Sequence, residues 1–200
     1  MHKFPPSFYT RRTLSIAKSL LGKIFVRKIG RKILSGKIVE VEAYLHNDPA
    51  CHAYRGMTER NKVMFNEGGY LYVYFTYGIH YCANVVTNKK GIGEAVLIRA
   101  VEPIGGIDVM MKNRFGKSDR HIQGDGHLRN LTNGPAKFAQ AFGLTKKQNG
   151  ISLLDDEIFI AEGEKVSSSR IIATTRIGIS AAQEKKWRFY IKENPWVSKR

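Results

Sequence analysis

The order of apolar and polar positions along the chain predicts alternating strands with a few helices between them. Apolar residues recur at helical spacing over residues 10–21, and Gly22 follows as a stop signal, so we expect a helix there. Apolar and polar residues then alternate over 23–28 and 32–44, with Gly30 between the two runs. This pattern is typical of two consecutive strands joined by a tight turn.

Similar patterns continue through the rest of the chain. Aromatic and aliphatic residues alternate over 70–86 and break at Gly78, which indicates a β-hairpin. A strand is expected at 94–102, and a helix at 133–143, where a proline opens the segment and a glycine closes it. The polar, glycine-containing residues 115–131 predict a long surface loop. Short strand-like runs occur at 158–161, 171–179 and 187–191.

These elements define a fold class. We expect an α+β protein, a single domain with a curved, mostly antiparallel β-sheet, a protruding β-hairpin and surrounding helices. The chain contains no internal repeat, low-complexity tract or linker-like stretch, so one domain is expected to cover residues 1–200. A chain of this length can bury about 70% of its unfolded surface, which is enough for one substantial core.

The charge balance adds a partner to this picture. Lysine and arginine total 33 against 17 acidic residues, which gives a formal net charge of +16. Such a bias indicates a polyanionic partner, usually nucleic acid, although a basic surface that serves only solubility is the alternative. No apolar run approaches the roughly 20 residues of a membrane-spanning helix.

The sequence also bears on the compartment in which the protein is expected. The N-terminal residues have no apolar signal-peptide core, and the two cysteines, Cys51 and Cys82, have no metal-ligand spacing. We therefore expect a reduced protein that is not secreted and holds no metal, in the bacterial cytosol at the nucleoid, or in the nucleus if eukaryotic. No oligomerisation signal is present, so a monomer is expected.

One short stretch carries candidate acid–base chemistry. In an extended strand, Glu40, Glu42 and Tyr44 share a face with Ile38, and His52 comes after a loop. A carboxylate beside an aromatic ring and a histidine can serve as a general base that activates water. The rings can also stack on a planar ligand. The alternative is an ordinary solvated strand face.

The predicted hairpin is rich in tyrosine. One face carries Tyr70, Tyr72 and Tyr74, and Tyr77 lies beside Gly78 at the expected tip. An aromatic residue at a hairpin tip is usually a packing or exposed residue. In a basic protein it can instead be a wedge between base pairs in the minor groove. Both interpretations stay open.

Two polar residues in the next strands have similarly open roles. Asn84 presents an amide that could read a base edge, or it could be an ordinary strand residue. Arg99 lies in an otherwise apolar strand, where an unpaired cation would be costly. Its partner is therefore either a buried acid or an incoming phosphate.

Seven segments in order carry a family resemblance over most of residues 36–198. They are IVEVEAY (38–44), ACHAYRG (50–56), TERNKVMF (58–65), YLYVYFTYGIHYCANV (70–85), EAVLIRAVEP (94–103), NGPAKFAQA (133–141) and RFYIKENPWVS (188–198). In these segments the sequence resembles the alkyladenine (3-methyladenine) DNA glycosylase family, of the type found in mammals and in many bacteria. This resemblance implies an activity and a set of site residues.

The resemblance assigns catalysis to two residues. It implies that Glu42 deprotonates a water that attacks the anomeric C1′ of a flipped nucleotide. Arg99 matches an arginine near that water and the target phosphate, which favours the phosphate as its partner. Glu40 matches a residue without the role of base, so the two glutamates are not expected to form an acid–base pair.

The resemblance also assigns the binding residues. The pocket for the flipped base maps to Tyr44, His52, Tyr72, Tyr74 and Asn84. Asn84 would obstruct the exocyclic amine of guanine. Tyr77 would fill the gap in the minor groove, and Met64 would lie in a segment that approaches the same groove. His80 and the Phe75–Thr76 pair depart from the form of the mammalian enzyme. Because these positions can tune the preference for one lesion over another, the resemblance specifies the range of lesions less closely than the other properties.

The implied function is a monofunctional DNA glycosylase of base excision repair that needs no cofactor. It would flip damaged purines out of double-stranded DNA and hydrolyse their N-glycosidic bond. Expected substrates are alkylated or deaminated purines such as 3-methyladenine, 7-methylguanine and hypoxanthine. Two alternatives from other classes are a non-catalytic reader of damaged DNA and an RNA-binding module.

Overall fold

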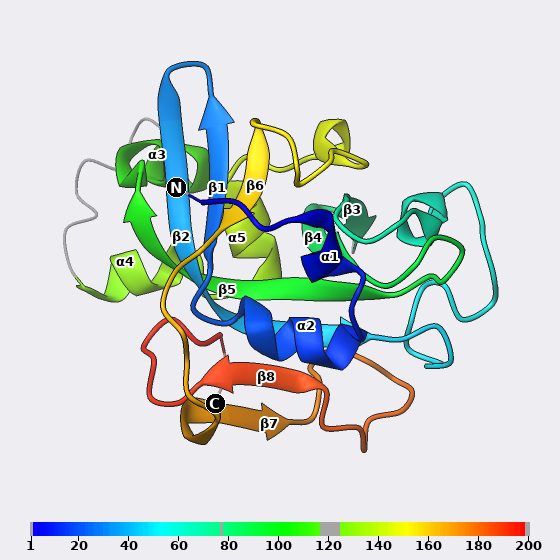
Figure 1. Ribbon diagram of the computed structural model, residues 1–200. Helices are drawn as coiled ribbons and strands as arrows, with labels where there is room; N and C mark the ends of the chain where they lie inside the picture. The colour runs from blue at the N-terminus through cyan, green and yellow to red at the C-terminus, as the bar shows by residue number, and fades with distance from the viewer. Residues whose placement is uncertain (1, 77, 117–124, 199–200) are drawn as a thin grey trace.

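The computed structural model describes residues 2–76, 78–116 and 125–198. Within them, eight strands form one antiparallel sheet, as the alternation predicted (Figure 1). The strands are β1 (Ile24–Ile29), β2 (Lys32–Tyr44), β3 (Leu71–Thr76), β4 (His80–Val86), β5 (Ala95–Gly105), β6 (Ile158–Ala161), β7 (Ile171–Thr174) and β8 (Arg188–Ile191). Their main order is β3-β4-β5-β2-β1-β6, and β8 pairs with both β2 and β7. Strand β2 therefore lies at the centre of the sheet and pairs with β1, β5 and β8.

Short helices surround this sheet. They are α1 (Pro6–Tyr9), α2 (Thr13–Leu20), α3 (Ile107–Phe115), α4 (Asp125–Asn130) and α5 (Pro135–Ala141), with 3-10 turns η1 (Lys62–Phe65), η2 (Lys146–Gln148) and η3 (Ser168–Arg170). Helix α2 packs on β2 and β5, whereas α5 packs on β4 and β5. The expected α+β class, with a single curved antiparallel sheet, is confirmed. Among the described residues, no helix has the length and apolar content to cross a membrane.

The core is built largely from the apolar faces that alternation marked. Phe25 of β1 meets Phe138 and Phe142 edge to face, with ring centroids 5.1 and 5.3 Å apart. Each fully buried apolar side chain of this size contributes about 1.5–3 kcal/mol through burial. These contacts fix helix α5 against the sheet, beside the strands that carry the candidate site.

Two local predictions are wrong. The loop expected over 115–131 contains a helix, α4, at its end. The strand expected over 171–179 ends at Thr174, and residues after it turn away from the sheet. Gly178 there adopts a φ of +76°, which a regular strand does not allow.

Strands β2 and β5 are irregular where their charged residues lie. Ile38 pairs with Val101, Glu40 with Ala100 and Val41 with Ile98, so Val39 and Arg99 have no register partner. Extra residues of this kind bend a strand and redirect side chains, commonly beside active sites. The strict alternation predicted from Ile38 is therefore broken at Val39, because Ile38 and Val39 both belong to the main core cluster.

Candidate active site

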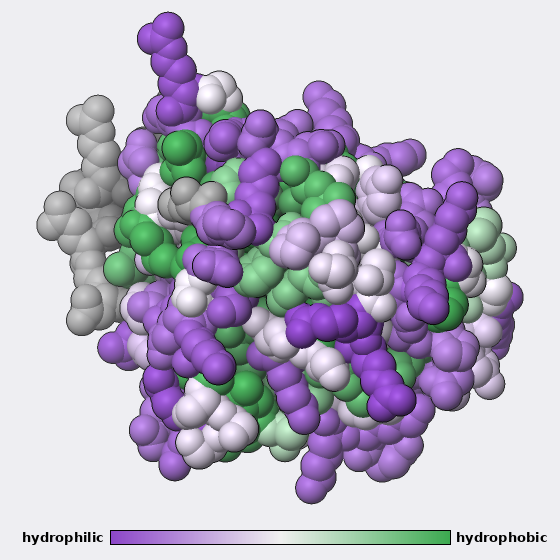
Figure 2. All heavy atoms as spheres, viewed as in Figure 1, coloured by the Kyte–Doolittle hydropathy of each residue, from purple (hydrophilic) through white to green (hydrophobic). Residues whose placement is uncertain are grey.

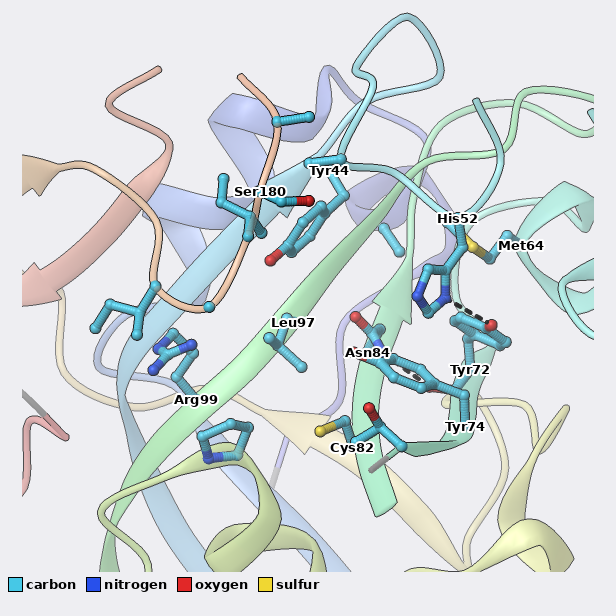
Figure 3. A pocket seen from close by; sticks show the side chains of 18 of the residues that line it. Tyr44, His52, Met64, Tyr72, Tyr74, Cys82, Asn84, Leu97, Arg99 and Ser180 are labelled. Atoms are coloured by element: carbon cyan, nitrogen blue, oxygen red, sulfur yellow. Dashed lines mark hydrogen bonds between the residues drawn. The ribbon is translucent and has the colours of Figure 1, made fainter. Parts of the chain in front are cut away.

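A cavity of about 340 Å³ opens at the ends of β2, β3, β4 and β5 (Figure 3). Strands and turns supply most of its lining: Tyr44, His52, Met64, Tyr72, Tyr74, Thr76, Cys82, Asn84, Ala95, Leu97 and Arg99. Pro49, Ala50, Pro135 and the segment 177–181 complete it. All five residues predicted for a base-binding pocket are therefore brought together.

Aromatic rings form its walls. Figure 3 shows Tyr44 on one side of the cavity, with His52 and Tyr74 on the other. The His52 and Tyr74 ring centroids are 4.5 Å apart, and Nδ1 of His52 lies 3.1 Å from the Tyr72 hydroxyl. Opposed ring surfaces of this kind suit a flat ligand, which gains about 1–3 kcal/mol per stacked base.

The aromatic side chains of the cavity wall are electrically neutral near pH 7. Burial, followed by the nearby Arg60 cation, lowers the pKa of His52, which keeps its imidazole uncharged at about pH 7. Burial raises the pKa of Tyr72 to about 12 and the pKa values of Tyr44 and Tyr74 still further. A positively charged flat ligand would therefore meet neutral, electron-rich rings on these walls, and Arg99 in the lining is paired with Glu40 and Glu42.

Glu42 lies directly behind this lining, with no solvent exposure. Its Oε2 accepts a hydrogen bond from the Tyr44 hydroxyl at 2.8 Å. Its Oε1 accepts one from the backbone N–H of Ile177 at 2.8 Å and lies 3.1 Å from Nη1 of Arg99. These three partners all line the cavity, so they fix the carboxylate at its boundary.

Glu40 is also fully buried, and it accepts four hydrogen bonds, three at Oε1 and one at Oε2. It accepts from Nε of Arg99 at 2.9 Å and Nε of Arg188 at 2.7 Å. The backbone N–H and hydroxyl of Ser198 donate to it at 2.7 and 2.9 Å. Burial alone would raise the pKa of Glu40, but Arg99, the Ser198 amide and Arg188 outweigh it and hold the pKa below its usual range. Glu40 is a structural anion.

Arg99 bridges the two carboxylates from its irregular position on β5. Its guanidinium also donates from Nη2 to the Ser198 hydroxyl at 3.3 Å. Of the two partners that the sequence left open, the structure contains the buried acid. Contact with a target phosphate stays a prediction.

The structure describes only one of the two residues that the resemblance assigns to the minor groove. Tyr77 lies outside the described residues. Met64 lies in η1 with 2% of its surface exposed, and packs in a small core cluster with Ala53 and Tyr72. Its side chain thus lines the cavity.

Sequence reasoning missed the segment 177–181, whose alternating apolar residues suggested a strand. Its Ile177 supplies an N–H to Glu42, and Figure 3 shows Ser180 beside Tyr44. The glycine at position 178 was the available signal, because glycine inside a strand pattern marks a bend or a close backbone approach. In the part of the chain that the structure describes, no cluster of three or more His, Cys, Asp or Glu side chains could hold a metal ion.

One face of the molecule is largely hydrophilic. Figure 2 shows hydrophilic side chains covering most of one face, with smaller apolar areas between them. The net charge of +16 would attract a polyanion towards such a surface.

Comparison with known proteins gives one consistent family. Residues 7–195 match the family model described as methylpurine-DNA glycosylase. A Carboxydothermus hydrogenoformans protein is 51% identical over 197 residues, which cover 98% of each chain. A Clostridium novyi protein is 48% identical over 205 residues and the full length of both, and one from Francisella tularensis is 50% identical over 192 residues, or 94% and 95% of the two chains. All three are provisionally named 3-methyladenine DNA glycosylases.

Proposed function

The chain belongs to the methylpurine-DNA glycosylase family, and from this premise we propose that it excises alkylated and deaminated purines from double-stranded DNA. It is a DNA repair glycosylase, a hydrolase of N-glycosyl bonds in base excision repair. The proposed substrates are 3-methyladenine, 7-methylguanine and hypoxanthine. One observation carries the proposal: the Glu42 carboxylate is fixed immediately behind an aromatic cavity within the size range of small-molecule sites.

The proposed reaction begins with extrusion of the damaged nucleotide, because its sugar and base cannot be reached inside the duplex. Glu42 accepts a proton from a water, and the water oxygen forms a bond to C1′. The C1′–N bond breaks, and its electron pair leaves with the base. A cationic base departs neutral, a neutral base such as hypoxanthine takes up a proton from solvent as it departs, and the DNA strand retains an abasic sugar. Anionic Glu42 also stabilises positive charge that develops on the sugar.

The cavity walls supply the proposed selectivity. Tyr44 would stack on one face of the base, with His52 and Tyr74 against the other and Tyr72 holding His52. Asn84 donates to the Tyr72 carbonyl at 3.2 Å, which holds its amide against the wall. There we propose that it obstructs the exocyclic amine of guanine.

The rest of the proposal concerns the domain, its location in the cell and its contacts with DNA. We propose one glycosylase domain over residues 1–200, acting as a monomer without a cofactor in the bacterial cytoplasm, at the nucleoid. Basic side chains would bind the DNA backbone. Tyr77 would fill the gap that the flipped nucleotide leaves, and Met64 would approach the minor groove from the cavity wall. Arg99 would orient Glu42 and lie near the target phosphate.

The test is single-turnover release of base from duplexes that carry 7-methylguanine or hypoxanthine, at fixed salt. Wild type should release the base and leave an abasic site in an uncut strand. Glu42→Gln should bind the same duplex with similar affinity and lose at least about 100-fold in rate, within the range for general-base loss. Glu59→Gln, at an exposed glutamate paired with Lys62, is the matched control and should retain the wild-type rate.

Other outcomes would reject the proposal in recognisable ways. Excision by Glu42→Gln at the wild-type rate would remove Glu42 as the base. Binding of the lesion duplex without release by wild type would indicate a reader of damage. Tighter binding of single-stranded RNA at the same salt concentration would indicate the RNA-binding alternative.

A further inference from the structure

A buried ion pair between Asp48 and Arg176 lies behind the cavity wall, outside the residues already assigned. Both side chains have no solvent exposure. The guanidinium contacts both carboxylate oxygens, Nη1 with Oδ2 and Nη2 with Oδ1, the latter at 3.0 Å. The desolvation of two charges commonly cancels the gain from their attraction, so stability alone accounts poorly for such a pair.

The same guanidinium holds the end of strand β2. Nη1 of Arg176 donates to the carbonyl of Ala43 at 3.0 Å. Ala43 separates the candidate base, Glu42, from the aromatic wall residue Tyr44. The guanidinium carbon also lies 4.7 Å from the centroid of the Tyr44 ring and 5.3 Å from that of Trp187. Arg176 therefore fixes both the backbone and the ring beside the carboxylate.

Arg176 also determines where the next residue points. Ile177 directs its N–H to Oε1 of Glu42 at 2.8 Å, and residues 177–181 then line the cavity. At the other end of this segment, Nη2 of Arg176 donates to the Ala182 carbonyl at 3.5 Å. The Arg176 guanidinium thus ties the two ends of segment 177–181 together.

Asp48 connects the pair to the opposite wall. Its side chain accepts from the Ala50 N–H at 3.3 Å, and its carbonyl accepts from the Cys51 N–H at 2.8 Å. These bonds shape the turn that presents His52 to the cavity. The ion pair therefore joins two loops and a strand end, each of which contributes to the site.

We propose that Asp48 and Arg176 are positioning residues for the reaction: together they set the orientation of Glu42 through the Ile177 N–H and hold Tyr44 against the cavity. This inference rests on the proposed function, in which Glu42 is the base. Small displacements of a catalytic group can cost about 100-fold in rate, even when their cause is remote. Loss of the pair should therefore reduce chemistry more than affinity.

The experiment separates positioning from folding with four variants. Arg176→Lys keeps the charge but loses the forked geometry, and Asp48→Asn keeps the shape but loses the charge. The double variant Arg176→Met/Asp48→Leu replaces the pair with apolar side chains, which often preserves or raises stability. Arg27→Met is the matched control, because Arg27 is also buried, donates to the Phe142 carbonyl and lies away from the cavity. Each variant is measured for thermal unfolding, affinity for lesion duplex and single-turnover release of 7-methylguanine.

We expect both single variants to bind the lesion duplex within about 3-fold of wild type and to release base about 10- to 100-fold more slowly. Arg176→Lys should retain the larger share of the rate. The double variant should recover stability but not rate, whereas Arg27→Met should lose stability but keep its rate while folded. A double variant that restores stability and rate together would reduce the pair to a folding element and overturn the inference. Wild-type release with unchanged rates in the folded variants would also overturn it, whereas absence of release by wild type itself would instead reject the proposed function.

Discussion

Two glutamates two positions apart are both withdrawn from water, yet their surroundings differ. Glu40 receives four donors that occupy its oxygens, whereas the donors to Glu42 all belong to the lining of the cavity. A carboxylate paired with two guanidiniums is held as an anion and gains little by accepting a proton. The neighbour at the cavity boundary, Glu42, is therefore the candidate base.

Substitution of Glu40 should therefore reduce stability. Glu40→Gln leaves the buried guanidiniums of Arg99 and Arg188 short of a compensating charge, and we expect a loss of about 3–5 kcal/mol in unfolding free energy. Urea denaturation at neutral pH measures it. An unchanged midpoint would show that the two arginines find other acceptors.

The family resemblance was sufficient to place Glu42, Tyr44, His52, Tyr72, Tyr74 and Asn84 together, whereas strand alternation by itself grouped Glu42 only with Ile38, Glu40 and Tyr44. The positions of the residues along the chain could not show which of the two glutamates accepts hydrogen bonds from two buried arginines. The partners that decide this, Arg188 and Ser198, lie 148 and 158 residues further along the chain. Arg176 was missed for the same reason, since its acid lies 128 residues away.

At the scale of elements, apolar runs bounded by turn residues predict the strands, although β2, β5 and β6 bury consecutive residues and therefore both faces. Alternation fails where the backbone departs from regular pairing. The extra residues at Val39 and Arg99 are invisible to a two-residue period, because each exists only relative to its partner strand. The segment after Thr174 resembles a strand, but its hydrogen bonds go to Glu42 and Arg176 instead of a neighbouring strand.

The turn that carries His52 is packed tightly against the glycine-containing connection between β4 and β5. A Cβ at Gly93 would lie 2.4 Å from the Cβ of Ala53 and 2.9 Å from the Phe65 ring. Gly93→Ala should therefore displace that turn, lower stability by about 1–3 kcal/mol and weaken binding of the lesion duplex.

The control for this substitution is Gly134→Ala, where the nearest atom to an added Cβ is 3.6 Å away in the flexible Lys137 side chain. Thermal unfolding of both variants gives the comparison. Equal stabilities of the two variants would show that the turn moves aside at no cost.

Over the whole molecule, buried acids make the basic protein sensitive to low pH. Glu94 accepts from His46 Nδ1 at 2.6 Å, from Asn88 at 3.2 Å and from the Thr13 hydroxyl. Burial would raise the pKa of Glu94, but these donors outweigh it and lower the pKa, as the partners of Glu40 do for that residue. Both groups therefore lose protons more readily in the folded chain than in the unfolded chain.

The sign of the resulting pH dependence is fixed. A depressed folded-state pKa adds stability above the unfolded value of about 4.3 and loses it as pH falls through the folded value. We expect the unfolding free energy to fall slightly below about pH 6.5, where the unfolded chain protonates His52 more readily than the folded chain, and steeply below about pH 5. Urea titrations across this range should show a shallower fall for Glu94→Gln than for wild type. Parallel curves for the two proteins would exclude Glu94 as a source of acid sensitivity.

Part of the cavity wall comes from loops rather than from the strand that carries the candidate base. Glu42 and the wall residue Tyr44 belong to β2, the strand that pairs with β1, β5 and β8, whereas Pro49, Ala50, His52 and residues 177–181 belong to loops. For protein engineering, we expect that loop residues without a contact to Glu42 can be varied while the carboxylate and its donors stay in place. A library restricted to Pro49, Ala50 and residues 179–181 would diversify the recognised base while the central strand, and the carboxylate on it, stay constant.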